Sequence, residues 1–121
     1  MSDDGLAPTR RKGWILVLVD GEETRTVPIP TKDGSSLTIG RSPTCDVTVD
    51  DFSMSRSHAR IYGGRHVQIE DLGSSNGTRV RGEKIAPRKR VRLRVGDLIE
   101  CGDAVLFVHA MPTGPERGPA T

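Results

Sequence analysis

Residues 37–78 read LTIGRSPTCDVTVDDFSMSRSHARIYGGRHVQIEDLGSSNGT. Short runs of apolar and β-branched residues alternate in this stretch with loops rich in Gly, Ser, Asn and Arg. The runs cover residues 37–39, 47–49, 58–62 and 66–70. Runs of this length between turn-forming residues are typical of β-strands. In the last run, alternation predicts that Val67 and Ile69 face a core. The stretch therefore predicts short strands whose polar loops carry the chemistry.

The segments on either side continue the same pattern. Residues 14–19 form a continuous apolar run, which suits either a strand covered on both faces or the first strand of a sandwich. Residues 24–29 should return as a strand that Pro28 places at a sheet edge. Residues 79–85, 88–95, 98–101 and 104–109 predict further short strands between turns. We find no uninterrupted apolar pattern of helical period over ten residues, so we expect an all-β fold, sandwich or barrel, with almost no helix.

Three local patterns make sharper predictions. Gly63-Gly64 predicts a two-residue hairpin, and Asn76-Gly77 is the strongest hairpin-turn signal in the chain. Residues 88–95 alternate cleanly between basic and apolar residues. A period of two predicts three side chains facing inward (Val91, Leu93 and Val95) and an outward row of three arginines (Arg90, Arg92 and Arg94).

Composition limits the class of protein. A chain of 121 residues holds one domain with one core, and 34% hydrophobic with 3% aromatic residues make that core small and aliphatic. A net charge of +2 predicts neither strong DNA affinity nor adhesion to a membrane. Cys45 and Cys101 lack metal-ligand spacing, so we expect two reduced thiols, no metal and no cofactor. With no signal peptide pattern at the start of the sequence, we expect a cytoplasmic protein.

The same patterns divide the chain into three parts. Residues 1–12 are polar and without periodicity, which predicts a flexible N-terminal tail. Residues 13–110 hold all the predicted strands. Residues 111–121 are rich in Pro and Gly, which is typical of a flexible tail or a linker to a further domain.

Three motifs in the central stretch carry a resemblance. The succession of Gly40-Arg41, then Ser55-Arg56-Ser57-His58, then Asn76-Gly77-Thr78 resembles the forkhead-associated (FHA) domain, a module that binds phosphothreonine peptides. The resemblance covers roughly residues 14–109. It implies a β-sandwich of two mainly antiparallel sheets. It also implies a non-enzymatic reader of a phosphothreonine-containing protein or peptide, downstream of a Ser/Thr kinase and often part of a larger signalling or transcription regulator.

The resemblance also implies a role for each matching residue. A phosphothreonine carries nearly two negative charges and several strong acceptor oxygens, so a host needs guanidinium, hydroxyl and free N–H donors. The phosphopeptide-binding residues are then Arg41, Ser55, Arg56, Ser75 and Asn76. Arg41 contacts the phosphate, Ser55 binds it through its hydroxyl and backbone N–H, and Asn76 grips the peptide main chain. Arg56 adds charge and Ser75 a hydroxyl. Gly40, His58 and Gly77 form the scaffold of the site.

Counting strands from the sequence conflicts with this grouping. A simple meander places the Ser55 and Asn76 loops at one end of the sheet and the Arg41 loop at the other. The resemblance implies that strands switch between two sheets and bring all three loops to one end. The second loop departs from the family pattern, for example at Ser53. The peptide side chains that the site prefers therefore stay open.

Four other interpretations remain. Ser57-His58 with Asp50 or Asp51 offers the parts of a hydrolase, but the chain has no nucleophile-elbow motif, P-loop or zinc motif, so catalysis is disfavoured. The arginines of residues 88–94 could bind nucleic acid weakly, although a balance of 18 basic and 16 acidic residues disfavours this. The fold could serve as a phosphate-independent scaffold. Finally, phosphorylated Thr9 could occupy the protein's own site or that of a second copy.

Overall fold

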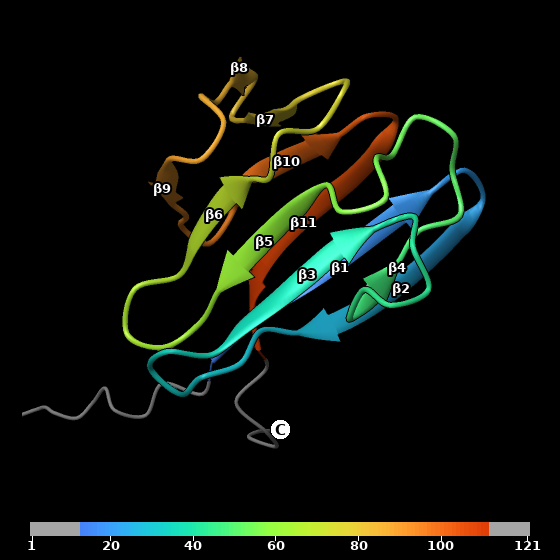
Figure 1. Cartoon of the computed structure of the whole chain (residues 1–121). Coiled ribbons are helices and arrows are strands. Elements are labelled where there is room, and N and C mark those ends of the chain that lie inside the picture. The colour runs from blue at the N-terminus through green and yellow to red at the C-terminus, as the bar shows by residue number, and fades with distance from the viewer. Residues whose placement is uncertain (1–12, 112–121) are drawn as a thin grey trace, which may run out of the picture.

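The computed structural model describes residues 13–111, where the chain forms strands and loops and no helix. Eleven strands in this range build the two sheets of a sandwich (Figure 1). In order across the six-stranded sheet they are β2 (Glu23–Pro28), β1 (Trp14–Asp20), β11 (Ala104–Ala110), β10 (Leu98–Cys101), β7 (Thr78–Val80) and β8 (Glu83–Lys84). In the five-stranded sheet they are β4 (Val47–Thr48), β3 (Ser36–Gly40), β5 (Ala59–Tyr62), β6 (Gln68–Asp71) and β9 (Arg90–Arg92).

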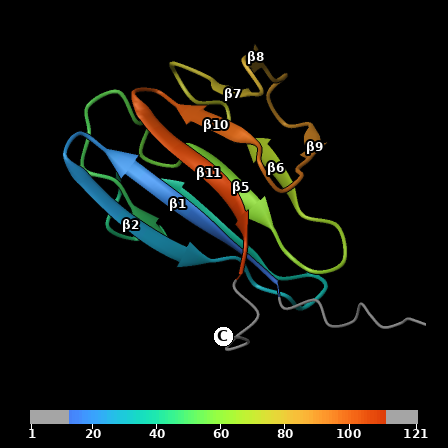
Figure 2. The same ribbon diagram turned by 180° about the vertical axis from the view of Figure 1, so that it is seen from behind.

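All neighbouring strands pair antiparallel except β3 and β4, which are parallel. The prediction of an all-β sandwich with two mainly antiparallel sheets is therefore confirmed. Figure 2 shows the six-stranded sheet from its outer side, with β1 and β11 side by side. Strand β11 pairs with β1 on one side and β10 on the other, so strands distant in sequence form the middle of this layer.

The core lies between the inner faces of the two sheets. In β1, Leu16 and Leu18 are fully buried while the residues between and beside them stay partly exposed. This alternation shows a strand with one buried face, which decides between the two interpretations of the apolar run 14–19. From the other sheet, Ile39, Ile61 and Ile69 are likewise fully buried. Val67 and Ile69 face the core as predicted, with 7% and 0% exposure.

The strand pairing brings the loops after β3, before β5 and after β6 to one end of the sandwich. Ile39 at the end of β3 pairs with Ala59 at the start of β5, and Ala59 also pairs with Asp71 at the end of β6. The meander count failed because it treated β4 as a full antiparallel strand. Strand β4 is instead a two-residue parallel strand at the sheet edge, and β3 is the direct antiparallel neighbour of β5.

Neither predicted hairpin forms as expected. Tyr62 pairs with Gln68, so the loop from β5 to β6 has five residues (63–67). A Cβ on Gly63 would lie 1.9 Å from the Pro30 carbonyl oxygen, so this glycine serves close contact with the neighbouring loop. The turn at Asn76-Gly77 carries the chain from β6 in one sheet to β7 in the other. Gly77 has the positive φ (+83°) that the turn signal predicts, but β7 pairs with β10.

The predicted strand over residues 88–95 is shorter than expected. Only Arg90–Arg92 forms β9; Leu93 is buried, but Val95 is 48% exposed instead of facing inward. The chain leaves the sheet here because Asp97 accepts a hydrogen bond from the Arg94 N–H (2.8 Å) and donates its own N–H to the Arg94 carbonyl (3.0 Å). Arg94 therefore belongs to a turn, and the prediction of a three-arginine row on one strand is wrong.

The described segment begins and ends on adjacent strands. Trp14 at the start of β1 pairs with Ala110 near the end of β11, at the end of the sandwich away from the three loops (Figure 1). The segments expected as tails, 1–12 and 111–121, lie outside the described residues except for Met111, and so does Thr9. Among the residues described, a membrane-spanning helix is not found.

Candidate functional site

Hydrogen bonds join the three loops at one end of the sandwich, at the upper right of Figure 1. The Arg41 N–H donates to the Ser55 carbonyl (2.9 Å) and the Ser42 N–H to the Arg56 carbonyl (3.1 Å). The Ser75 N–H donates to the Ser55 hydroxyl oxygen (2.9 Å). The structure thus brings the five predicted binding residues into three connected loops. These loops are residues 41–46, 49–58 and 72–77.

Gly40 allows the first two loops to approach each other. A Cβ on Gly40 would lie 2.1 Å from the Arg56 carbonyl oxygen and 3.0 Å from the Cys45 sulfur. Real Cβ atoms do not come so close to a backbone carbonyl, so only glycine fits. The φ of Gly40 is not positive. Gly40 is therefore required for contact between two backbones and not for a left-handed turn.

Arg41 is held in place by the second loop. Its side chain is half-buried, and its Nε donates to the Met54 carbonyl (3.1 Å). Within residues 13–111 its two terminal nitrogens donate to no other residue. The guanidinium is therefore oriented at one edge and keeps its fork of donors for an external acceptor.

His58 lies fully buried beneath the site and joins the second and third loops. Its Nδ1 accepts a hydrogen bond from the Ser55 N–H (3.1 Å), which leaves Nε2 as the donor to the Gly77 carbonyl (2.8 Å). The Ser55 N–H is thus occupied, contrary to the expectation that it is free for phosphate. The neighbouring N–H of Arg56 has no hydrogen-bond partner within residues 13–111 and is therefore available as a donor.

Asp71 organises the third loop, and the sequence analysis missed it. Its carboxylate is 2% exposed and accepts hydrogen bonds from the Gly73 and Ser74 N–H groups (3.0 and 3.1 Å) and from the Ser74 and Thr78 hydroxyls. Burial raises the pKa of Asp71, but these hydrogen bonds outweigh it and lower the pKa below 3.8. An Asp at the end of a strand with Gly-Ser two and three residues later is the signal that could have identified this turn.

Ser53 connects the second loop to two others. Its carbonyl accepts from the Asn76 side-chain amide (2.8 Å), and its hydroxyl oxygen accepts from the Asp103 N–H (2.8 Å) in the turn between β10 and β11. Ser53 itself donates its N–H and hydroxyl to one oxygen of the Asp51 carboxylate (2.8 and 2.7 Å), which lowers the pKa of Asp51. Asn76 is exposed, with its amide fixed at the edge of the second loop.

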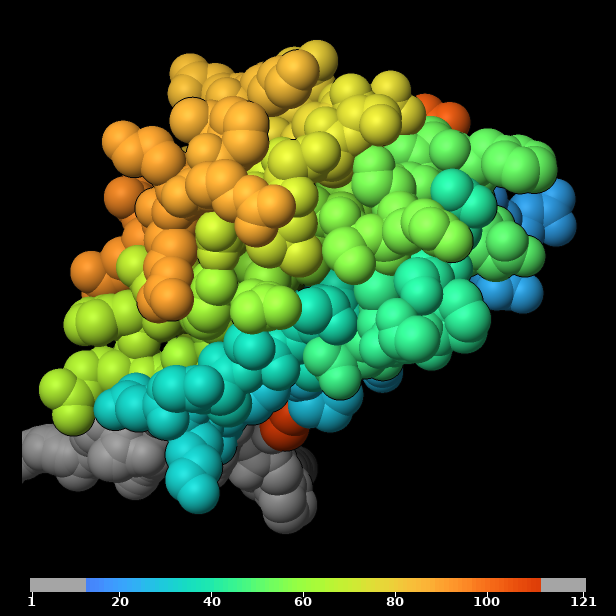
Figure 3. Space-filling view, viewed as in Figure 1, coloured from blue at the N-terminus to red at the C-terminus, as the bar shows by residue number. Residues whose placement is uncertain are grey.

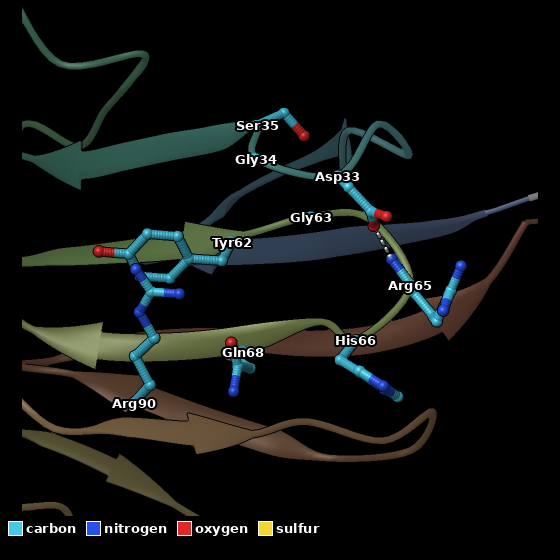
Figure 4. Close-up of a pocket in the computed structure, with 9 residues that line it drawn as sticks. All are labelled: Asp33, Gly34, Ser35, Tyr62, Gly63, Arg65, His66, Gln68 and Arg90. Atoms are coloured by element: carbon cyan, nitrogen blue, oxygen red, sulfur yellow. Dashed lines mark hydrogen bonds between the residues drawn. The ribbon is translucent and has the colours of Figure 1, made fainter.

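A separate cavity of about 370 Å³ lies away from these loops, by the loops that precede β3 and β6 (Figure 4). Tyr62, Gln68 and Arg90 line it together with residues 33–35, and none of the predicted site residues does. The Arg90 guanidinium carbon lies 3.6 Å from the centre of the Tyr62 ring, a cation–π contact. Arg90 is therefore engaged with its own protein, which further weakens the interpretation of an arginine row that binds nucleic acid.

The arrangement also argues against the hydrolase interpretation. His58 has both ring nitrogens occupied by backbone groups and is fully buried, so it cannot accept a proton from the exposed Ser57 hydroxyl. In the described part of the chain, no three His, Cys, Asp or Glu side chains gather in a way that could hold a metal ion. Cys45 and Cys101 are both free thiols.

Comparisons with known proteins agree with this geometry. The FHA domain family model matches residues 37–102. The chain is 40% identical over 82 residues to the oxoglutarate dehydrogenase inhibitor of Corynebacterium efficiens, covering 66% of the chain and 55% of that protein. It therefore spans about half the length of this curated relative.

Two solved structures extend the likeness to the fold. The FHA domain of CT664 protein from Chlamydia trachomatis superposes with a TM-score of 0.73 at 28% identity, covering 82% of this chain and 98% of that one. An FHA domain solved in a structural and functional analysis of phosphothreonine-dependent FHA domain interactions gives a TM-score of 0.71 at 29% identity, covering 84% and 99%. The β-sandwich fold described above is thus shared with these domains.

Proposed function

The chain belongs to the FHA domain family, and on that premise we propose that it is a non-catalytic module that binds phosphothreonine-containing proteins. One observation carries the proposal: hydrogen bonds gather the loops of Arg41, Ser55 and Asn76 into one connected surface. The phosphothreonine dependence named for one structural relative supports the same ligand class.

The donors at this surface suit a phosphate. Arg41 offers two terminal guanidinium nitrogens, and the Ser55 hydroxyl accepts from Ser75 while its own proton has no acceptor among the described residues. The Arg56 N–H and side chain lie beside it on an exposed loop, and the Ser75 side chain is exposed on the third loop. Guanidinium and hydroxyl donors to a dianionic phosphate form charge-assisted hydrogen bonds, which are about twice as strong as neutral ones.

The peptide main chain would be held by Asn76. Its side-chain nitrogen uses one of two protons on the Ser53 carbonyl, so one N–H and the amide oxygen remain to bind a backbone. Main-chain contacts of this kind give affinity without reading sequence. Because a phosphothreonine ligand needs a kinase to make it, we infer an upstream Ser/Thr kinase. A role as the sensor domain of a larger regulator is part of the same proposal.

Fluorescence anisotropy with a degenerate phosphothreonine peptide pool tests the proposal, with unphosphorylated and phosphoserine pools as controls. We expect binding to the phosphothreonine pool alone. Loss of the guanidinium in Arg41→Ala should weaken binding roughly 10- to 100-fold, the effect of removing a hydrogen bond to a charged group. The matched control is Arg92→Ala, an exposed arginine of β9 with the same charge change.

The other outcomes point to the alternatives. A folded protein that binds none of the pools would contradict the proposal and favour a phosphate-independent scaffold. Equal binding to polyanions that Arg92→Ala weakens and moderate salt abolishes would favour the nucleic-acid interpretation.

A further inference from the structure

Phe52 is the most exposed large apolar residue in the described chain, with 97% of its surface accessible. Two other large apolar residues of the described chain are exposed, Val95 with 48% and Phe107 with 37% of the surface accessible. Phe52 lies in the loop after β4, which projects at the upper right of Figures 1 and 3. Single exposed apolar residues are common on proteins, so exposure alone assigns no role. The surroundings of Phe52 decide the matter.

The backbone around Phe52 is fixed by hydrogen bonds. The Met54 N–H donates to the Asp51 carbonyl (3.0 Å), which closes a turn with Phe52 and Ser53 at its centre. Ser53 is bound to Asp51, Asn76 and Asp103, and Met54 is buried in the core. Most residue types can occupy the Phe52 position in such a turn. The turn is thus rigid, and it has no need of an aromatic side chain.

The same bonds connect Phe52 to the proposed phosphopeptide site. Ser53, the next residue, accepts a hydrogen bond from the Asn76 amide on its carbonyl. Met54, which follows, accepts one from Arg41 on its carbonyl. Asn76 is the residue proposed to grip the peptide main chain. A peptide bound through Arg41 and Asn76 would therefore pass close to position 52, because both anchors hydrogen-bond to the loop segment that immediately follows it.

We propose that Phe52 determines peptide specificity by packing against an apolar side chain of the bound phosphopeptide. This proposal rests on the proposed function and adds a preference to it. The ring can contact a ligand without weakening the fold, because the hydrogen bonds of the turn do not depend on it. Two acidic residues, Asp50 and Asp51, precede the ring, so an apolar rather than an acidic peptide residue fits this part of the surface.

Labelled peptides with one phosphothreonine flanked by alanines test the proposal. Leucine replaces alanine at one position at a time, from one to four residues on either side, which spans about 13 Å in each direction. We expect one position, or two on the same side, at which leucine tightens binding about tenfold over the all-alanine peptide. Phe52→Ser should abolish this gain and leave the affinity for the all-alanine phosphopeptide within about twofold.

Phe107→Ser is the matched control, since Phe107 is an exposed phenylalanine of β11 outside the three loops, and it should retain the leucine gain. A leucine gain at no position, or a gain that persists in Phe52→Ser, overturns the proposal while binding of the all-alanine phosphopeptide upholds the proposed function. If no phosphopeptide binds, both fail. If Phe52→Ser only changes the sedimentation of the protein, the ring is covered by a second copy and the peptide proposal is wrong.

Discussion

At the scale of single residues, several positions in the site leave space for, or hydrogen-bond to, the backbone of another loop. Gly40 makes room for the Arg56 carbonyl, and Gly102 does the same for Ser53, whose carbonyl would lie 2.5 Å from an added Cβ. The sequence identified Gly40, His58 and Gly77 as scaffold by resemblance. It could not reveal that the Ser55 N–H is occupied by His58, because that depends on the ring orientation of a histidine three residues away.

Gly40→Ala tests the close approach of the first two loops. The added Cβ would force the Arg56 carbonyl away, so we expect a loss of about 3 kcal/mol in the free energy of unfolding, measured by urea denaturation. The control is Gly34→Ala, where φ is +88° but nothing lies within 4 Å, and which should cost about 1 kcal/mol. Equal losses in the two variants would show that backbone contact at Gly40 is unimportant.

At the scale of elements, the sequence predicted most strands but not how they pair. Residues 14–19, 98–101 and 104–109 are short apolar runs between turns, and they have the expected strand boundaries to within a residue. The two-residue strand β4 and the crossover after β6 carry little periodicity of their own, and their positions depend on contacts with distant strands. For that reason the meeting of the three loops could be expected only from the family resemblance.

The loop after β6 should make stability depend on acid. The pKa of Asp71 is lowered in the folded protein, so its hydrogen bonds contribute fully above pH 3.8 and are lost as pH falls through the lowered pKa. Asp71→Asn should cost about 2 kcal/mol in the free energy of unfolding at pH 7, because it leaves buried donors poorly paired. The cost should shrink as the pH falls through the lowered pKa of Asp71, measured by urea denaturation across pH.

Glu83→Gln provides the control for that series, because Glu83 is an exposed carboxylate of β8 and its loss should change stability by less than about 0.5 kcal/mol. A cost of Asp71→Asn that stays constant from pH 7 to pH 2.5 would mean that the charge of the carboxylate does not stabilise the loop.

At the scale of the whole molecule, the two cysteines report on different parts of the structure. Cys101 is fully buried in the core, and burial raises the pKa of its thiol to about 12. Cys45 is half-buried in the first loop, where its thiol donates to the Arg56 carbonyl (3.1 Å). Because the thiolate is the reactive form, a protected Cys101 should react only when the sandwich opens.

Thiol labelling of Cys45→Ser tests whether the sandwich opens as one unit. With only Cys101 left, labelling by an aromatic disulfide reagent should be slow in buffer and accelerate with urea in step with global unfolding. The wild type should show one additional, faster thiol. Rapid labelling of Cys101 that is independent of urea would reveal local opening between β7 and β10 instead.

The pairing of Trp14 with Ala110 has a practical consequence for protein engineering. Neighbouring strands lie about 5 Å apart, so the two ends of this segment are separated by little more than the width of a hairpin. The segment could therefore be inserted into a surface turn of a host protein without forcing apart the residues on either side of that turn. Since the Arg41 and Asn76 loops lie at the far end, such a graft would display them outward, as the tip of a probe for phosphorylated proteins.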